Sequence, residues 1–136
     1  MTRKTIKKQK TNFEDVQAFH DKFGLKRPNF PMLPFYHKDL ASFRTKFLRE
    51  ELSEFELALA EGDLENAFDA LLDLVYVAMG TADLMGLPWQ KGWDEVQRAN
   101  MSKKRAESAN DSTRGTQLDV IKPENFKAPD HSYIWE

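Results

Sequence analysis

Residues 47–80, FLREELSEFELALAEGDLENAFDALLDLVYVAMG, decide the fold because they contain two helical patterns joined by a short turn. Leucine and phenylalanine recur every three or four residues up to Gly62, which is a suitable left-handed end for a helix. Asp63 can then cap the next helix, which has almost no helix-breaking residues. Two helices joined by so short a turn should pack antiparallel as a hairpin.

Helical patterns continue on both sides of this hairpin. Thr11 and Glu14 have the spacing of a capping box, and a connector over residues 25–34 with three prolines separates the first helix from the hairpin. Regular two-residue alternation is absent outside the C-terminal tail, so we predict an all-α fold, a bundle of four to five helices with an extended C-terminal tail. The expected helices run from Thr11 to Gly24, from Lys38 to Gly62, from Leu64 to Met85 and from Trp89 to about Arg105.

The 136 residues fit one domain with a flanking segment at each end. We expect a basic flexible arm over residues 1–11, a helical domain over residues 12–107, and a polar loop and extended tail over residues 108–136 packed on that domain. The most hydrophobic stretch, residues 71–87, contains two aspartates and is too short to span a membrane. The absence of cysteine excludes disulfides and thiolate metal sites, and it favours a cytoplasmic location.

Acidic side chains interrupt the apolar pattern of both hairpin helices. Glu51 and Glu54 lie on one flank of the apolar stripe of the first helix, at the border of the expected core. Asp69 and Asp73 share a narrow face of the second helix, whose other faces are apolar, as in the middle of a bundle. An antiparallel hairpin could bring the two pairs together and raise their pKa values through repulsion, unless cations neutralise them. The apolar stripe consists of Leu48, Leu52, Phe55 and Leu59.

A site made only of carboxylate oxygens suits a hard divalent ion, Mg²⁺ or Mn²⁺, that also recruits phosphate oxygens from a substrate. The alternative is that Glu51 and Glu54 form an exposed helix face while Asp69 and Asp73 pair with lysines or arginines. We favour the metal site, because an unpaired Asp73 among leucine and valine side chains would be costly.

The stretch REELSEFELALAEGDLENAFDALLDLVYVAMGTA, followed by DEVQRANMSK, resembles the all-α nucleoside triphosphate pyrophosphohydrolase superfamily, the MazG-like and phosphoribosyl-ATP pyrophosphohydrolase-like proteins. Weaker similarity to the phage and bacterial branch extends to VQAFHDKFGL and VIKPENFKAPD. The resemblance implies a catalytic helical bundle that assembles as a homodimer or homotetramer. It also implies Mg²⁺-dependent cleavage between the α and β phosphates, which gives a nucleoside monophosphate and pyrophosphate.

The same resemblance implies roles for the acidic residues. Glu51 and Glu54 match the first metal-binding pair of the family, and Asp73 matches the final aspartate of the second pair. The glutamate expected in that second pair is replaced by Ala70, so Asp69, one position earlier, is the fourth candidate ligand, directly or through water.

The resemblance also implies catalytic and substrate-binding residues. Glu50 matches an extra acid that often precedes the first pair, so Glu50 or Glu54 is the candidate general base. Asn100 and Lys103 match a substrate-contacting pair, although either could simply lie in solvent at the helix end. The substrate-binding candidates are therefore His20, Asn100, Lys103 and Lys122, the first and last of them from less diagnostic segments.

The expected partners are a nucleoside triphosphate and further copies of the chain, without a membrane. A nucleic-acid partner is not expected at a net charge of −2, although the lysine-rich arm keeps that alternative open. Two other functions remain open. One is hydrolysis of phosphoribosyl-ATP in histidine biosynthesis, and the other is a helical oligomerisation module that has kept the fold without catalysis.

Overall fold

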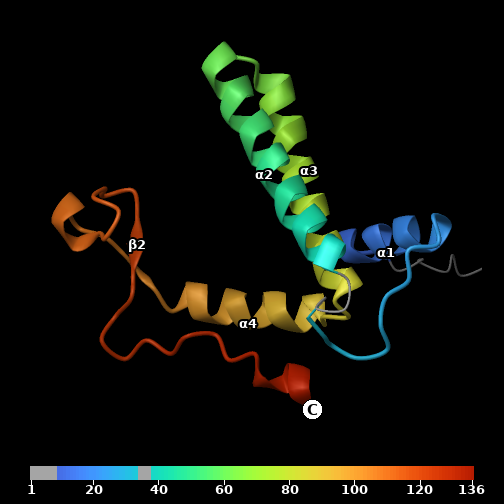
Figure 1. The fold of residues 1–136 in the computed structure, drawn as a ribbon. Coiled ribbons are helices and arrows are strands. Elements are labelled where there is room, and N and C mark those ends of the chain that lie inside the picture. Colours follow the sequence, from blue (N-terminus) through green and yellow to red (C-terminus); the bar gives the residue numbers. More distant parts are fainter. Residues whose placement is uncertain (1–8, 34–37) are drawn as a thin grey trace, which may run out of the picture. The chain divides into compact units, whose positions relative to one another are not determined.

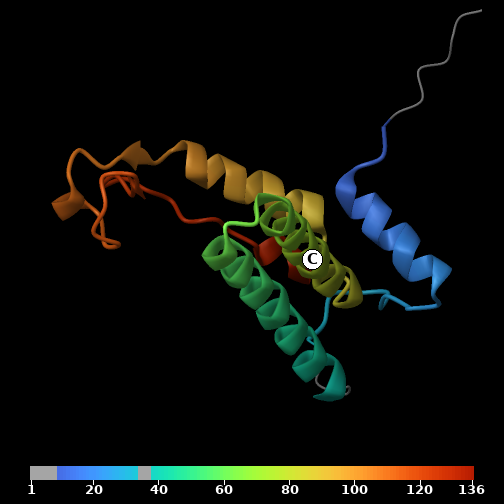
Figure 2. The ribbon, with the colours of Figure 1, turned by 90° about the horizontal axis from the view of Figure 1, so that it is seen from above.

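The computed structural model describes residues 9–33 and 38–136, and its fold is all-α, as predicted. Its central feature is the hairpin of α2 (Lys38–Glu61) and α3 (Leu64–Leu84), which lie side by side in both views (Figure 1, Figure 2). Most of the predicted basic arm falls outside the described residues. Within the described part, no helix is long and apolar enough to cross a membrane.

The turn of the hairpin forms as the sequence predicts. Gly62 has a φ of 68°, the left-handed conformation that glycine adopts without strain. The Asp63 N–H donates to Ala58 O at 2.9 Å, which satisfies a carbonyl of the last turn of α2. The Asp63 carboxylate then accepts a hydrogen bond from Asn66 N at 3.0 Å and caps α3. This turn sets the antiparallel course of the two helices.

Helix α1 (Asn12–Lys22) begins with the predicted capping box of Thr11 and Glu14. It packs against the C-terminal half of α3, where Phe19 meets Tyr76 edge-on with ring centroids 5.6 Å apart. The N-terminal half of α3 therefore packs mainly against α2.

Two expectations about the apolar faces of the hairpin are wrong for this chain. Leu52 and Leu59 are 45% and 58% exposed, whereas Glu51 is only 9% exposed. The face of α2 that meets α3 therefore runs through Glu51 and Ala58, and the predicted leucine stripe is a second apolar face. Helix α3 is likewise not enclosed all round. Its exposed apolar side chains are Leu64, Phe68, Leu71, Leu72 and Val75.

The chain divides into two compact units, residues 1–89 and residues 90–136. In the second unit, α4 (Trp89–Met101) ends earlier than the expected Arg105, where the Ser102 hydroxyl donates to Ala99 O at 2.6 Å. The following residues form a short antiparallel ladder instead of helix. Its strands are β1 (Lys104–Arg105) and β2 (Val120–Ile121), and two short 3₁₀ helices cover Ala109–Asp111 and Ser132–Trp135.

The C-terminal tail lies along α4 within this second unit. Arg98 pairs with Glu95 at 2.8 Å and donates to the carbonyls of Lys127 and Ala128. Glu95 in turn accepts a hydrogen bond from Asp130 N at 3.1 Å. These contacts join the tail backbone to one face of the helix.

Candidate active site

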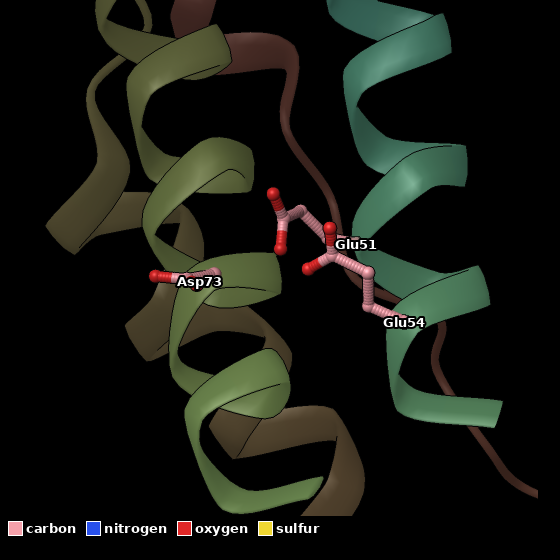
Figure 3. A group of neighbouring side chains, drawn as sticks. All are labelled: Glu51, Glu54 and Asp73. Carbon is pink, nitrogen blue, oxygen red and sulfur yellow. The ribbon is translucent and has the colours of Figure 1, made fainter. Parts of the chain in front are cut away.

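Three carboxylates converge between the hairpin helices. Glu51 and Glu54 are one turn apart on α2, so both side chains leave the same side of that helix. They extend toward α3, which carries Asp73 (Figure 3). One carboxylate oxygen from each residue lies within 4.8 Å of the other two. The hairpin thus brings together three of the four predicted metal ligands.

The cluster is electrostatically strained. Glu51 is buried, and its Oε2 atom has no hydrogen-bond partner among the residues that the structure describes. Burial, followed by the charge of nearby Glu54, raises the pKa of Glu51. Burial, followed by the charge of Asp69, also raises the pKa of Asp73. The folded chain therefore holds these carboxylates at a cost that protons or a cation would relieve.

A divalent cation fits this set of donors. Among the residues that the structure describes, no ion pair involves Glu51, Glu54 or Asp73, so the pairing with lysine or arginine that the sequence left open is not seen for them. A buried oxygen without a partner, surrounded by two further carboxylates, is a suitable ligand for a hard ion such as Mg²⁺ or Mn²⁺.

Asp69 and Glu50 lie beside the cluster and not within it. An open pocket of about 260 Å³ toward the hairpin turn is lined in part by Glu54, Asp69 and Ala70. Ala70, which occupies the expected glutamate position, is buried close to Ala58 where the helices meet. The side chain of Glu50 is exposed, and its charge contributes to the raised pKa of Glu51.

The sequence model of the family described as phosphoribosyl-ATP pyrophosphohydrolase matches residues 16–100, which is more than half of the chain and includes the acidic cluster. The chain belongs to this family. The phosphoribosyl-ATP pyrophosphohydrolase family is part of the MazG-like nucleoside triphosphate pyrophosphohydrolase superfamily, so the resemblance noted in the sequence is confirmed. No match was found among curated proteins.

Membership of the phosphoribosyl-ATP pyrophosphohydrolase family indicates an enzyme that hydrolyses a pyrophosphate linkage in a nucleotide. Such enzymes typically depend on a metal ion, and Glu51, Glu54 and Asp73 form a group that could hold one.

His20 lies in the interior of the first unit and not at its surface. Its ring is buried, with Nδ1 2.6 Å from Asp83 Oδ2. Arg27 donates to the other oxygen of Asp83 at 2.7 Å. Burial opposes the ionisation of Asp83, but the hydrogen bonds from Arg27 and His20 outweigh it and lower its pKa. A buried imidazole that already holds a carboxylate is poorly placed to meet a phosphate from solvent.

Arg44 is a second buried polar group that the sequence analysis missed. Its guanidinium donates to Val77 O at 2.9 Å and to Thr81 Oγ1 at 3.0 Å. Space for it exists because Gly80 has no side chain, since a Cβ there would lie 2.7 Å from Arg44 Nη2. One feature of the sequence could have indicated that Arg44 is buried. It lies one turn after Leu40 and one turn before Leu48, on the same side of the helix as these apolar residues.

The remaining predicted substrate-binding residues lie in the second unit. Asn100 is exposed near the end of α4, and its carbonyl accepts a hydrogen bond from Lys103 N at 3.1 Å. The Lys103 and Lys122 ammonium groups both lie over the ring of Phe126.

Proposed function

We propose that the protein is a Mg²⁺-dependent nucleoside triphosphate pyrophosphohydrolase that converts ribo- or deoxyribonucleoside triphosphates to monophosphates and pyrophosphate. The observation that carries the proposal is the convergence of Glu51, Glu54 and Asp73, with a buried oxygen that lacks a partner. A role in maintaining nucleotide pools would place the enzyme in the cytoplasm.

In this proposal, Glu51, Glu54 and Asp73 hold Mg²⁺, with Asp69 contributing directly or through water. The ion would polarise the phosphates, increase the acidity of a water molecule and offset the charge of the departing pyrophosphate. Glu50 or Glu54 would accept the proton of the attacking water. As the water oxygen bonds to the α-phosphorus, the bond from that phosphorus to the α–β bridging oxygen breaks and releases pyrophosphate.

The resemblance makes Asn100, Lys103 and Lys122 candidate contacts to the nucleotide. Asn100 would donate a hydrogen bond to the nucleotide, and Lys103 and Lys122 would offset the phosphate charge. Mutating each of these residues should raise KM more than it lowers kcat, because their contacts exist before the reaction begins.

Release of pyrophosphate from a panel of nucleotides with Mg²⁺ tests the activity. Asp73→Ala should abolish release while leaving the far-UV circular dichroism unchanged, and Glu56→Gln, on an exposed part of α2, is the matched control. If the wild type is active and Asp73→Ala hydrolyses nucleotides at the same rate, the assignment of Asp73 is wrong.

Phosphoribosyl-ATP is the second candidate substrate, because the matching family carries that name. The chemistry is the same, since both reactions cleave between the α and β phosphates. Assaying phosphoribosyl-ATP beside the common nucleoside triphosphates under identical conditions distinguishes the two, because the true substrate should have the higher kcat/KM.

We also propose that the protein assembles as a homodimer or homotetramer through the exposed apolar face of the hairpin. Leu64, Phe68 and Leu72 are 82%, 62% and 53% exposed, and apolar side chains grouped in this way are typical of an interface. Light scattering after size exclusion should show an oligomer, and Leu72→Glu should shift it toward monomer. An oligomer without turnover or Mg²⁺ stabilisation would favour the non-catalytic module instead.

A further inference from the structure

The part of the hairpin that contains the carboxylate cluster has no positive charge of its own. Residues 50–90 contain ten aspartates and glutamates and neither lysine, arginine nor histidine. Among the ion pairs between described residues, Asp83 is the only one of these ten acids that takes part. The net charge of the whole chain is nevertheless only −2, so the compensating basic residues lie in other segments.

The open pocket of about 260 Å³ beside the cluster has the lining that a lysine side chain requires. Glu54, Glu61 and Asp69 bring three exposed carboxylates to it. A lysine has an apolar stem of four carbons and an ammonium group that donates three hydrogen bonds. The stem can therefore cover the apolar lining while the ammonium group meets the carboxylates. The apolar part of the lining consists of Leu57, Ala58 and Ala70.

A buried acceptor next to this pocket also lacks a partner. Glu51 is 9% exposed, and no described residue donates a hydrogen bond to its Oε2 atom. Its carboxylate comes within 4.8 Å of an oxygen of Glu54, which lines the pocket (Figure 3). A buried carboxylate is normally paired with a cation or bound to a metal. The acidic surface is therefore suited to a positively charged group from outside the hairpin.

Residues 1–10 carry the charge that the hairpin lacks, and they are attached close to it. Burial, followed by the charge of Asp15, raises the pKa of Tyr76, so the first half of α1 lies near α3. Asp69 is about 10 Å from Tyr76 along that helix, whereas residues 1–10 could span up to about 33 Å if extended. Such a short tether gives the basic side chains a high effective concentration at the pocket. The basic residues of this segment, which contains no acid, are Arg3, Lys4, Lys7, Lys8 and Lys10.

We propose that the N-terminal arm, residues 1–10, docks on the acidic surface of the hairpin in the metal-free protein, with a lysine in the pocket of Glu54, Glu61 and Asp69, and that Mg²⁺ displaces it. The arm is then an internal competitor of the metal ion. Because exposed ion pairs are individually weak and screened by salt, the contact is reversible. Docking does not depend on the proposed activity, whereas its displacement rests on the metal site of the proposed function.

Carbodiimide crosslinking of the full-length protein, followed by peptide mass spectrometry, tests the docking, because this reagent joins a lysine to a carboxylate only when the two are in contact. In EDTA at low salt, lysines of residues 1–10 should crosslink to Glu54, Glu61 or Asp69. Saturating Mg²⁺ should abolish the crosslinks. Glu61 is not a candidate metal ligand, so the loss of its crosslink reports departure of the arm and not protection of the carboxylate by the ion.

Two sets of variants measure the strength of the contact. Glu61→Gln should reduce the crosslinks to Glu54 and Asp69 about twofold or more, because an exposed ion pair is lost. Glu65→Gln is the matched control, since Glu65 is an exposed acid of the same hairpin that does not line the pocket, and it should leave them unchanged.

Replacing the four lysines of residues 1–10 with glutamine should remove the competition with Mg²⁺. In titration calorimetry at low salt, this full-length variant should bind Mg²⁺ about two- to fivefold more tightly than wild type, because no fraction of the protein is blocked by the arm. The difference should disappear in about 1 M salt, where the screening length falls to about 3 Å.

Three results would overturn the proposal. They are the absence of crosslinks between residues 1–10 and the hairpin, crosslinks that persist in saturating Mg²⁺, and an equal loss of crosslinks in Glu61→Gln and Glu65→Gln. A nucleic acid that binds through the same lysines, in a protein without the hairpin crosslinks, would assign the arm to that partner instead.

The two proposals fail in different ways. If the arm crosslinks to the hairpin and Mg²⁺ releases it, but no nucleotide is hydrolysed, the docking stands and the proposed function fails. If nucleotides are hydrolysed but the arm does not crosslink to the hairpin, the docking is wrong and the proposed function stands.

Discussion

Replacing Glu51 with glutamine should stabilise the metal-free protein at pH 7. The oxygens of Glu51, Glu54 and Asp73 lie within 4.8 Å of one another. Two unit charges at that separation repel by about 1 kcal/mol in water and about 3.5 kcal/mol at an effective dielectric constant of 20. Glutamine removes one charge and keeps the size of the side chain. We therefore expect Glu51→Gln to increase the free energy of unfolding in EDTA by about 1 to 3 kcal/mol.

The increase in the free energy of unfolding that Glu51→Gln causes should depend on pH. Burial, followed by the charge of Glu54, raises the pKa of Glu51 above its ordinary value of 4.5. Such a group contributes stability that is fully present below its unfolded pKa and is lost as the pH rises through its folded pKa. The advantage of Glu51→Gln should therefore shrink as the pH falls and the wild-type carboxyl takes up a proton, and it should grow toward pH 7.

Mg²⁺ should stabilise the wild type much more than Glu51→Gln. At a concentration one hundred times its Kd, a ligand that binds only the folded state stabilises it by about 2.7 kcal/mol. Wild type should show this increase, and Glu51→Gln should lose most of it.

Urea unfolding followed by far-UV circular dichroism measures both effects, at a fixed protein concentration because assembly also contributes to stability. Glu56→Gln, on an exposed part of the same helix, should change stability by less than about 0.5 kcal/mol. A Glu51→Gln protein that is less stable than wild type in EDTA would refute the argument from repulsion. One that keeps the full response to Mg²⁺ would refute the metal site.

Three further substitutions test the packing that positions the cluster, each by thermal or urea unfolding. Gly80→Ala should cost about 1 to 3 kcal/mol, because its Cβ would displace the buried Arg44 guanidinium from 2.7 Å away. Asp83→Asn should cost about 2 to 3 kcal/mol at pH 7 by weakening the bonds to Arg27 and His20, and this difference should shrink as the pH falls through the lowered pKa of Asp83. Asp63→Ala removes the cap of α3 and should cost about 1 kcal/mol.

The hairpin and its ends could be predicted from sequence because local chemistry determines them. Gly62 supplies the left-handed residue, Asp63 supplies the cap, and both act within a few residues of the turn. Helical spacing then places Glu51 and Glu54 on one side of α2, and the antiparallel turn directs them toward Asp73. The convergence of these three acids therefore followed from spacing and a single turn.

The face of α2 that meets α3 could not be predicted in the same way. The helix has two apolar faces, and a helical wheel does not show which of them a neighbour covers. Leu52 and Leu59 form the more obvious face, but the structure turns Ala58 and Glu51 toward α3. Small side chains such as Ala58, Ala67 and Ala70 allow the two helices to approach closely, and this advantage appears only when both helices are considered together.

Contacts between distant segments were the least accessible to sequence reasoning. Asp83 interrupted a hydrophobic stretch in the sequence, but its partners His20 and Arg27 are more than 50 residues away. Lys103 and Lys122 become neighbours only because α4 ends at Met101 and a two-residue ladder follows. Strands of that length leave no periodic pattern in a sequence.

The two halves of α3 differ in what stabilises them. The C-terminal half is held by the Asp83 network with α1 and by the bonds of Arg44 from α2. The N-terminal half packs mainly against α2, where the carboxylates of Glu51 and Asp73 oppose close packing. An ion shared between the helices would supply there the attraction that hydrogen bonds supply at the other end. Binding of the ion should therefore stabilise this half of the hairpin more than the other half.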